Sequence, residues 1–253
     1  MSTPPLFLVE SLPPGAHAVL DGPEGRHAAT VKRLRPGEVV LLGDGRGTLA
    51  HAVVDATGRD VVELTITDRS MVPAPSPRVV VAQALVKGDR GELAVELATE
   101  AGVDAIVPWT AARCVVRWAD AQRGDKGLAR WRSTAREAAK QARRAWSPEV
   151  HEPASTRALA SLVTEAACAL VLHESATAML ADVPLPAAGD VLLVVGPEGG
   201  VTDEELAQLT AAGAKAVRLG PEVLRASTAA AVALGALGVL TPRWSPRPAI
   251  TTR

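Results

Sequence analysis

A short apolar run that leads directly into a glycine-rich segment constrains the fold of this chain most strongly. Val191-Leu-Leu-Val-Val195 has no polar position, which is typical of a strand buried on both faces of a parallel sheet. It continues into Gly196-Pro-Glu-Gly-Gly200, and Thr202-Asp-Glu-Glu205 then forms a capping box that opens a helix. Ligands of open α/β sheets bind at such strand ends, where glycines allow close backbone approach. The alternative is a tight turn that needs glycine for its geometry alone, and spacing does not decide between them.

A second segment of the same kind follows along the chain. Val217-Arg-Leu-Gly-Pro221 ends a predicted strand, and an alanine-rich helix is predicted from Ser227 to Leu240, with Ser227 as its N-cap. Arg225 lies directly before this helix. The two glycine-bearing turns could form opposite walls of one pocket. A capped, buried helix with a solvated Arg225 explains the same residues, and the pattern alone slightly favours that simpler explanation.

The rest of the chain predicts two domains. Three prolines between Met71 and Pro77 interrupt regular structure, so we place a boundary there and predict domains at residues 1–72 and 73–253. Short β-rich runs with glycine turns precede the boundary, with one helix at residues 24–34, and predict a small β-barrel. Strand and helix segments alternate after it. This order predicts an α/β domain with a parallel sheet and helices on both faces.

Composition excludes several classes of function. Cys114 and Cys168 are far apart and lack metal-ligand spacing, so we expect neither a disulfide nor a metal site. The apolar stretch from Ala229 to Leu240 is shorter than the about 20 residues that span a bilayer. The first residues lack the charge and apolar pattern of a signal peptide. We therefore expect a cytoplasmic protein that does not bind membranes.

Basic residues gather locally although the formal net charge is −1. Ten basic residues and three acidic ones lie between positions 113 and 144, where a helix is predicted from Lys126 to Arg144. Four of the basic residues recur at helical spacing on one face, which suits contact with RNA phosphates. A solvated helix face is the usual explanation of such a pattern, but the local excess favours RNA. The predicted RNA-binding residues, which include a second cluster near residue 33, are Lys32, Arg33, Arg35, Arg113, Arg132, Arg136, Lys140 and Arg143.

Four ordered blocks of sequence form a specific combination. They are His27 to Gly37 with Gly43-Asp-Gly45, Gln83 to Arg90 with Glu100 to Val103, Val195 to Gly200, and Leu219 to Ala229. Together they resemble the RsmE family of 16S ribosomal RNA uridine-N3 methyltransferases, and the likeness covers nearly the whole chain. Some positions depart from the family pattern: Glu96-Leu97 stands in place of Gln-Lys, Lys140-Gln141 in place of Glu-Gln, and Ala226-Ser227 precedes Thr228 where the family has x-Glu. None of these changes touches the glycine loops.

The resemblance implies a specific fold and reaction. The C-terminal domain would have the SPOUT-type α/β fold with a trefoil knot, and the N-terminal domain would be PUA-like. The chain would act as a homodimer on 16S ribosomal RNA of the small subunit, with S-adenosylmethionine as methyl donor and no metal. The residues expected to line the methyl-donor site are Leu172, Gly196, Glu198, Gly199, Gly200, Leu219, Gly220, Leu224, Ser227 and Thr228.

The implied reaction assigns roles to few side chains. Uridine N3 becomes a nucleophile only when its proton leaves, so a cation that stabilises the resulting anion would speed the reaction. Arg225 is our candidate, because a guanidinium keeps its charge and can bind a uracil carbonyl. Glu198 and His173 are both possible proton acceptors. Glu198 more simply hydrogen-bonds amides of its own loop, and His173 more simply ends a strand.

Two other functions remain open at this point. One is a catalytically inactive RNA-binding or ribosome-assembly module of the same fold, which would share the basic residues but have no need of a methyl-donor pocket. The other is a metabolic α/β enzyme that uses the glycine loops for a small substrate. The basic cluster argues against the second, and binding of S-adenosylmethionine would separate the first from a methyltransferase.

Overall fold

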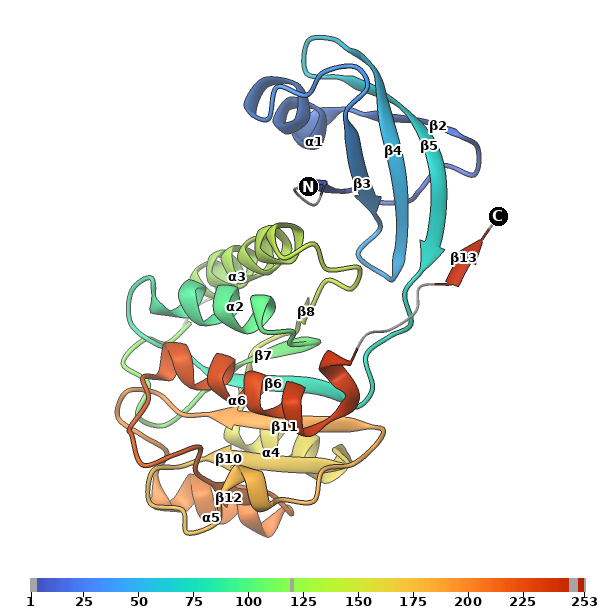
Figure 1. The fold of residues 1–253 in the computed structure, drawn as a ribbon. Helices are drawn as coiled ribbons and strands as arrows, with labels where there is room; N and C mark the ends of the chain where they lie inside the picture. The colour runs from blue at the N-terminus through green and yellow to red at the C-terminus, as the bar shows by residue number, and fades with distance from the viewer. Residues whose placement is uncertain (1–3, 119–120, 246–249, 253) are drawn as a thin grey trace. The chain divides into compact units, whose positions relative to one another are not determined.

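A computed structural model describes residues 4–118, 121–245 and 250–252, which form two compact units. Unit 1 takes its described residues from Met1–Ala74, Ala139–Ser147 and Pro246–Arg253. Unit 2 takes them from Pro75–Ala138 and Pro148–Ser245. Figure 1 shows the elements of both. The proline-rich segment lies where the first unit passes into the second, while residues 139–147 return to unit 1, which no sequence pattern indicated.

Unit 1 is built on a six-stranded sheet. Its strand order is β1-β3-β4-β5-β13, with β2 also paired to β5. Residues on β5 are buried at every second position from Val62 to Ile66, which is the alternation expected of a sheet with one face on a core. The strands are β1 (Leu6–Leu8), β2 (His17–Leu20), β3 (Val39–Gly43), β4 (Thr48–Thr57), β5 (Val62–Met71) and β13 (Ile250–Thr252).

The predicted N-terminal helix differs from the observed one. Helix α1 (Gly22–Arg26) passes directly into a π-helical turn, η1 (His27–Val31), whereas one helix was predicted over residues 24–34. Pro23 at the start of α1 suits the first turn of a helix, since it has no amide to leave unbonded. Arg33 then adopts a left-handed φ of 55°, which ends the helical path before the predicted stop.

Unit 2 contains a seven-stranded sheet in which every pair of neighbouring strands is parallel. The order is β12-β10-β11-β6-β7-β8, and β9 extends the β7 edge. This confirms the predicted α/β class. The strands are β6 (Arg78–Ala84), β7 (Ala105–Thr110), β8 (Glu149–Val150), β9 (Ala154–Ser155), β10 (Cys168–Leu172), β11 (Asp190–Val195) and β12 (Lys215–Val217).

Helices cover both faces of this sheet, and the strand order explains which helix lies where. Parallel crossovers are right-handed, so connections that run in opposite directions along the sheet place their helices on opposite faces. This rule places α2 on one face and α4 and α5, which pack on each other, on the other face; α6 follows the last strand of the sheet and packs on α2 (Figure 1). The helices are α2 (Arg90–Glu100), α3 (Ala121–Gln141), α4 (Thr156–Glu165), α5 (Asp203–Ala211) and α6 (Ala226–Leu240), with short 3₁₀ turns η2 (Leu180–Asp182) and η3 (Pro242–Trp244).

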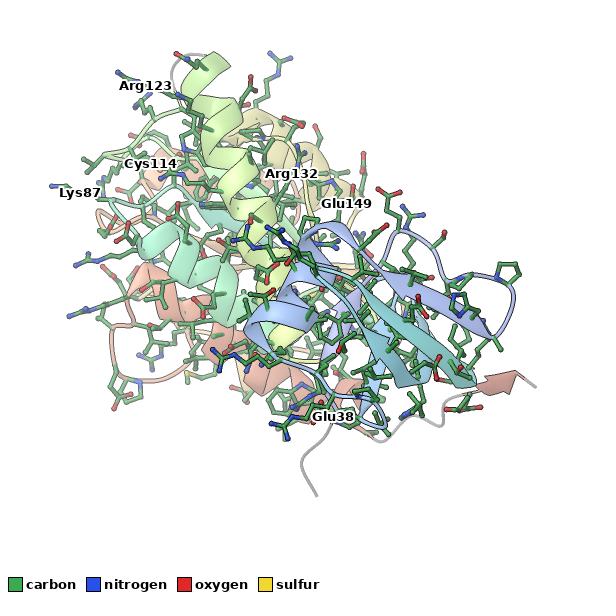
Figure 2. The ribbon with its side chains drawn as sticks, turned by 90° about the horizontal axis from the view of Figure 1, so that it is seen from above. Glu38, Lys87, Cys114, Arg123, Arg132 and Glu149 are labelled. Carbon is green, nitrogen blue, oxygen red and sulfur yellow. The ribbon has the colours of Figure 1, made fainter. Side chains whose placement is uncertain are left out.

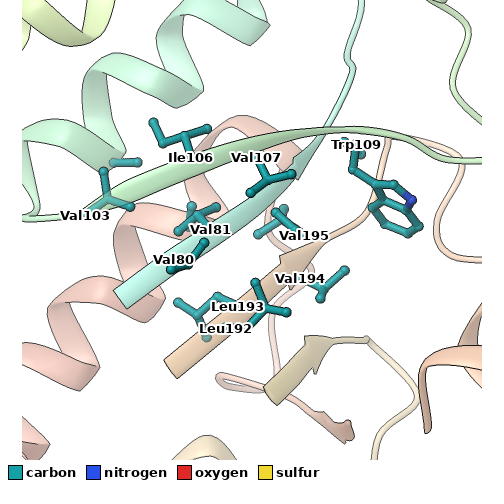
Figure 3. Packing of buried hydrophobic residues seen from close by; sticks show 14 of the residues in the cluster. Val80, Val81, Val103, Ile106, Val107, Trp109, Leu192, Leu193, Val194 and Val195 are labelled. Atoms are coloured by element: carbon teal, nitrogen blue, oxygen red, sulfur yellow. The ribbon is translucent and has the colours of Figure 1, made fainter. Parts of the chain in front are cut away.

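The core of unit 2 lies around the central strands (Figure 3). All residues of β11 from Val191 to Val195 are buried, as the uninterrupted apolar run predicted. Burial of each such side chain contributes about 1.5–3 kcal/mol, so the strand that leads to the glycine loop is firmly held. Trp109, near the end of β7, is fully buried in the same core.

Three sequence predictions about helix ends were wrong. Helix α3 begins at Ala121 and ends at Gln141, whereas it was predicted from Lys126 to Arg144, because Arg143 turns to a left-handed φ of 53°. Helix α6 begins one residue early. Its N-cap is Arg225, without a side-chain cap, and Ser227 is buried inside the first turn instead of capping it. Small, buried side chains there let the helix start pack closely.

The described residues bear on the expectations about membranes, metals and disulfides. In the described ranges, no helix combines the length and apolar character needed to cross a membrane. The same residues contain no cluster of three or more His, Cys, Asp or Glu side chains placed to hold a metal ion. Cys114 and Cys168 are both free thiols.

Candidate functional site

A cavity of about 770 Å³ opens in unit 2 where β10, β11 and β12 end. It lies at the carboxyl ends of parallel strands, the edge at which α/β sheets bind ligands. Residues 195–201 form one wall, residues 217–227 form the other, and Leu172 to Glu174 connect them. Its volume lies within the range of about 300–1,000 Å³ typical of small-molecule sites. The two glycine-bearing turns therefore enclose one space.

The first wall, residues 196–200, needs its glycines for close packing and backbone angle. A Cβ on Gly196 would come within 2.8 Å of the Val201 side chain. Gly200 has a φ of 76°, which L side chains rarely adopt, and its amide donates to the Pro197 carbonyl at 2.9 Å. The turn thus folds tightly on itself, and its residues 196–200 line the cavity.

Glu198 connects this wall to the loop that follows β6. Its Oε1 accepts a hydrogen bond from the Lys87 amide at 3.3 Å and lies 3.6 Å from Arg90 Nη1. The prediction that Glu198 bonds amides of its own loop was therefore wrong. The partner amide comes from a different strand end, because the ends of parallel strands gather at one edge.

Arg113 closes the outer side of the same wall. Its Nη1 donates to the Gly199 carbonyl at 2.9 Å, and a Cβ on Gly199 would lie 3.1 Å from the Arg113 Cβ. Arg113 follows β7 and was predicted to bind RNA. The structure places its guanidinium at the cavity, against the glycine loop.

The capping box of α5 is present and does more than cap. Thr202 accepts from the Glu205 amide at 3.2 Å, and Glu205 Oε2 accepts from the Thr202 amide at 3.1 Å. Glu205 is only 6% exposed, and its Oε1 also accepts from the Ala112 amide at 2.8 Å and the Thr156 hydroxyl at 3.0 Å. The sequence indicated the cap but not these two further bonds.

The second wall is more open. Residues 221–225 are exposed, including Val223 at 76%, and Arg225 has an extended backbone as the N-cap of α6. Within the described part of the chain, the Arg225 guanidinium has no hydrogen-bond or ion-pair partner. Its charge is therefore available to a ligand in the cavity.

Nine of the ten residues predicted for the methyl-donor site line the cavity, and Thr228 does not. The Thr228 hydroxyl instead donates to the Arg225 carbonyl at 3.2 Å, in the first turn of α6. His173 also lines the cavity, with its Nδ1 2.9 Å from the Ser175 hydroxyl. Arg225 and Glu198, the other two candidates for the chemistry, lie on opposite walls.

Sequence reasoning missed two cations of the cavity. Arg90 and Arg218 both line it. Arg90 closes the Lys87-Gly-Asp-Arg90 segment directly after β6, so its place at a strand end could have identified it. Arg218 directly follows β12 in the same way. With Arg113 and Arg225 they make four basic lining residues, balanced by four acidic ones, Glu174, Glu198, Asp203 and Glu222.

Local environment shifts two titratable groups near the first wall. Burial raises the pKa of the Cys114 thiol above its ordinary value of 9.0, so this thiol stays protonated and unreactive near neutral pH. Backbone hydrogen bonding at the start of α5, together with the Thr202 hydroxyl, lowers the pKa of Glu204. The helix start therefore keeps a negative charge beside the cavity.

The predicted basic helix face is only partly present. Figure 2 labels Arg123 near the amino end of α3 and Arg132 further along it. Arg132 is exposed and pairs with Glu152 at 2.9 Å. Lys140 is 11% exposed and pairs with Glu24 at 2.8 Å, and Arg143 lies beyond the helix and donates to the Pro4 carbonyl. Lys140 and Arg143 thus hold unit 1 together, since both partners belong to that unit.

Comparison with known proteins agrees with this geometry. Residues 73–238 match the RNA methyltransferase domain family, and residues 20–67 match the RNA methyltransferase PUA domain. Ribosomal RNA small subunit methyltransferase E of Mycobacterium bovis is 57% identical over 94% of this chain and 93% of its own length. The Bacillus subtilis protein of that name is 31% identical over 88% of this chain and 90% of its own.

Solved structures give the same result. The Neisseria gonorrhoeae ribosomal RNA small subunit methyltransferase E bound to S-adenosylmethionine is 29% identical, with a TM-score of 0.83, over 94% of this chain and 98% of that one. A Legionella pneumophila methyltransferase in complex with the same cofactor is 30% identical, with a TM-score of 0.83, over 95% of this chain and 99% of that one.

The fold and the site thus define an RNA methyltransferase with a PUA-like half-barrel sheet followed by a parallel α/β methyltransferase domain. The extent of the similarity is specific enough to name one family. The chain belongs to the ribosomal RNA small subunit methyltransferase E family, as its four sequence blocks predicted.

Proposed function

We propose that the chain transfers the methyl group of S-adenosylmethionine to N3 of a uridine in 16S ribosomal RNA. The observation that carries this proposal is the cavity between residues 195–201 and 217–227. Two of the solved structures similar to this chain contain S-adenosylmethionine. The relatives' shared name supports small-subunit ribosomal RNA as the substrate, and the sequence resemblance supports uridine N3.

The residues present suit this methyl donor. An adenosyl group needs an apolar surface and backbone groups that can pair with its ring edge, and the cavity offers Leu172, Leu219 and Leu224 beside the backbone of both glycine turns. The methionine part carries both charges, and the cavity has acidic and basic side chains in equal number. The donor residues proposed are the nine that line the cavity.

Catalysis would depend on placing the uracil ring in line with the methyl donor and on stabilising the uracil anion. When bound, S-adenosylmethionine supplies an electrophilic methyl group on a sulfonium sulfur. Arg225 would stabilise negative charge on a uracil oxygen as the N3 proton leaves, because its guanidinium has no partner among the described residues. Glu198 is occupied by Arg90 and the Lys87 amide, and His173 Nδ1 by the amide and hydroxyl of Ser175, so both remain proposed proton acceptors on equal terms.

RNA would be held by exposed basic residues in both domains, at 1–72 and 73–253. Lys32, Arg33 and Arg35 are exposed, as are Arg113, Arg132 and Arg136. Their contacts with phosphates would make affinity fall steeply with salt, with the slope reduced by about one for each lost contact. Lys140 is removed from this set, because its side chain is only 11% exposed and pairs with Glu24, whereas the exposed Arg143 stays in it.

We further propose that the chain acts as a homodimer in the cytoplasm, with a trefoil knot in its C-terminal domain. The dimer and the knot rest on the sequence resemblance, and Val115, Val223 and Val239, each more than 70% exposed, are candidate residues for the dimer contact. Sedimentation equilibrium tests the dimer directly. A mass of one chain at micromolar concentration would contradict it.

Mass spectrometry of ribosomal RNA tests the reaction. RNA from cells that lack this protein should lose one N3-methyluridine, and the wild-type gene should restore it, whereas an Arg225→Ala gene should not. If the modification persists without the protein, the methyltransferase proposal fails. If purified protein binds the small subunit but not S-adenosylmethionine, it is a binding module of the same fold.

A further inference from the structure

A single buried carboxylate connects the first wall of the cavity, residues 196–200, to two other segments. Glu205 lies in the first turn of α5 and is 6% exposed. Its Oε2 accepts from the Thr202 amide, two residues after the glycine loop ends. Its Oε1 accepts from the Ala112 amide in the turn after β7 and from the Thr156 hydroxyl at the start of α4.

Helix capping alone does not explain this arrangement. A capping box needs one carboxylate oxygen, and it forms equally well at the surface, where the second oxygen stays hydrated. Burying a carboxylate costs free energy unless its oxygens are bonded. Here three donors satisfy it, and one of them, Thr156, in turn accepts from the Trp109 indole at 3.2 Å. The extra bonds join strand ends that are distant in sequence.

The Ala112 bond acts directly on the cavity. Ala112 precedes Arg113, and residues 111–114 form a turn closed by the Cys114 amide on the Ala111 carbonyl at 3.1 Å. Arg113 then reaches back to the Gly199 carbonyl at 2.9 Å. One carboxylate therefore holds the C-terminal end of the glycine loop by two routes, directly through the Thr202 amide and indirectly through Ala112, Arg113 and the Gly199 carbonyl.

We infer that Glu205 is a positioning residue that fixes the Arg113 side of the methyl-donor cavity by holding the Ala112 amide. This rests on the proposed function, since the ligand whose binding it improves is S-adenosylmethionine. Glu205 does not line the cavity and touches no ligand there. Its effect is to keep the Gly199 backbone in the position that a ligand requires, so that binding need not order it.

Glu205→Gln is the sharpest variant. Glutamine has the same shape but only one acceptor oxygen, so either the Thr202 amide or the Ala112 amide would face an NH₂ group. Loss of one buried, charge-assisted hydrogen bond corresponds to about a tenfold effect on an equilibrium constant. Thr202→Ala is the matched control, because it removes the N-cap acceptor of α5 and leaves the Glu205 carboxylate on Ala112.

Calorimetric titration with S-adenosylmethionine, together with thermal unfolding, tests the inference on the full-length protein. We expect Glu205→Gln to raise the Kd about tenfold, and Thr202→Ala to lower the Tm with little change in Kd. The double variant Glu205→Gln/Arg113→Ala should bind S-adenosylmethionine no more weakly than whichever of the two single variants binds it less tightly. The two substitutions act through the same contact, so their effects on Kd should not multiply. Thr156→Val should show the same effect in smaller degree, and it serves if Glu205→Gln does not fold.

The outcomes are distinguishable. Unchanged Kd in Glu205→Gln and Thr156→Val, or effects of Glu205→Gln and Arg113→Ala that multiply, would overturn the positioning role while the proposed function stands. Wild-type protein that binds no S-adenosylmethionine would overturn the proposed function first, and the inference with it.

Discussion

The two walls of the cavity are built in opposite ways. Residues 196–200 are bound from three sides, by Arg113, by the loop carrying Lys87 and Arg90, and by the capping box of α5. Residues 221–225 are exposed, and the cap of α6 has no side-chain hydrogen bond. Both walls follow a strand with a Gly-Pro pair, so the motif itself does not decide rigidity.

The difference indicates a division of labour. A wall that is already ordered binds a ligand at a lower entropic cost, whereas an open wall can adjust to a second ligand or chain. We therefore assign methyl-donor binding mainly to residues 196–200 and the response to RNA mainly to residues 221–225. A substitution in one wall should therefore change donor binding or RNA methylation selectively, and a substitution that changes the other property would contradict this assignment.

The largest effect is expected at the open wall. Arg225→Ala should lower kcat about 100- to 1,000-fold, the usual cost of losing one donor to a developing oxyanion, while the Kd for S-adenosylmethionine changes less than about threefold. Single-turnover methylation of small ribosomal subunits measures the first quantity and calorimetry the second. Arg225→Lys keeps the charge without the fork, so it should recover only part of the rate. A weakened Kd with normal kcat would reverse the assignment.

A smaller effect is expected at the first wall, residues 196–200. Gly200 has a φ of 76°, so Gly200→Ala should destabilise this turn by about 1–2 kcal/mol. The expected result is weaker S-adenosylmethionine binding with kcat nearly normal at saturating donor. Gly213, which also has positive φ but follows α5 away from the cavity, offers the control Gly213→Ala. Equal loss of affinity in both variants would show that general strain, not the cavity wall, is responsible.

The ion pair between Arg90 and Glu198, on the wall formed by residues 196–200, should contribute less to the affinity for S-adenosylmethionine. Arg90 and Glu198 have half- and one-third-exposed side chains, and their nearest charged atoms lie 3.6 Å apart. Solvent-exposed pairs contribute at most about 1 kcal/mol. Arg90→Ala should therefore change Kd no more than a few-fold, and the change should shrink as salt is added. A loss of binding as large as that of Gly200→Ala would mean that Arg90 contacts the ligand itself.

The smallest effect is expected from pH. Burial raises the pKa of Cys114, which lies in the Arg113 turn, above 9.0. Below that value the thiol is protonated in folded and unfolded chains alike, so stability should not depend on it. At higher pH the unfolded thiol ionises first, and stability should fall. Urea unfolding of wild type and Cys114→Ala between pH 7 and pH 10 measures this, and a wild-type-specific loss below pH 8 would contradict it.

Local patterns predicted the fold well where the backbone alone decides it. The apolar run at 191–195, the capping box at Thr202 and Glu205, and the alternation of strands and helices all appear in the structure. Helix ends were predicted less well. Arg143 leaves α3 and Ser227 is buried in α6 because tertiary contacts, not local propensity, set those ends.

The site was predictable in outline only. Both glycine turns could be recognised, but their partners could not, because Lys87, Arg113 and Thr156 are each more than forty residues from the residues they hold. The basic residues show the same limit. Helical spacing placed Lys140 with Arg132, yet Lys140 is only 11% exposed and pairs with Glu24, and no spacing rule contains that contact.

The most direct test is a crystal structure of this chain grown with S-adenosylmethionine. We predict one donor molecule per chain, with its adenosine between residues 196–200 and 219–224 and its methyl group facing Arg225. A donor bound elsewhere, or a ligand that contacts only one of the two turns, would contradict the account.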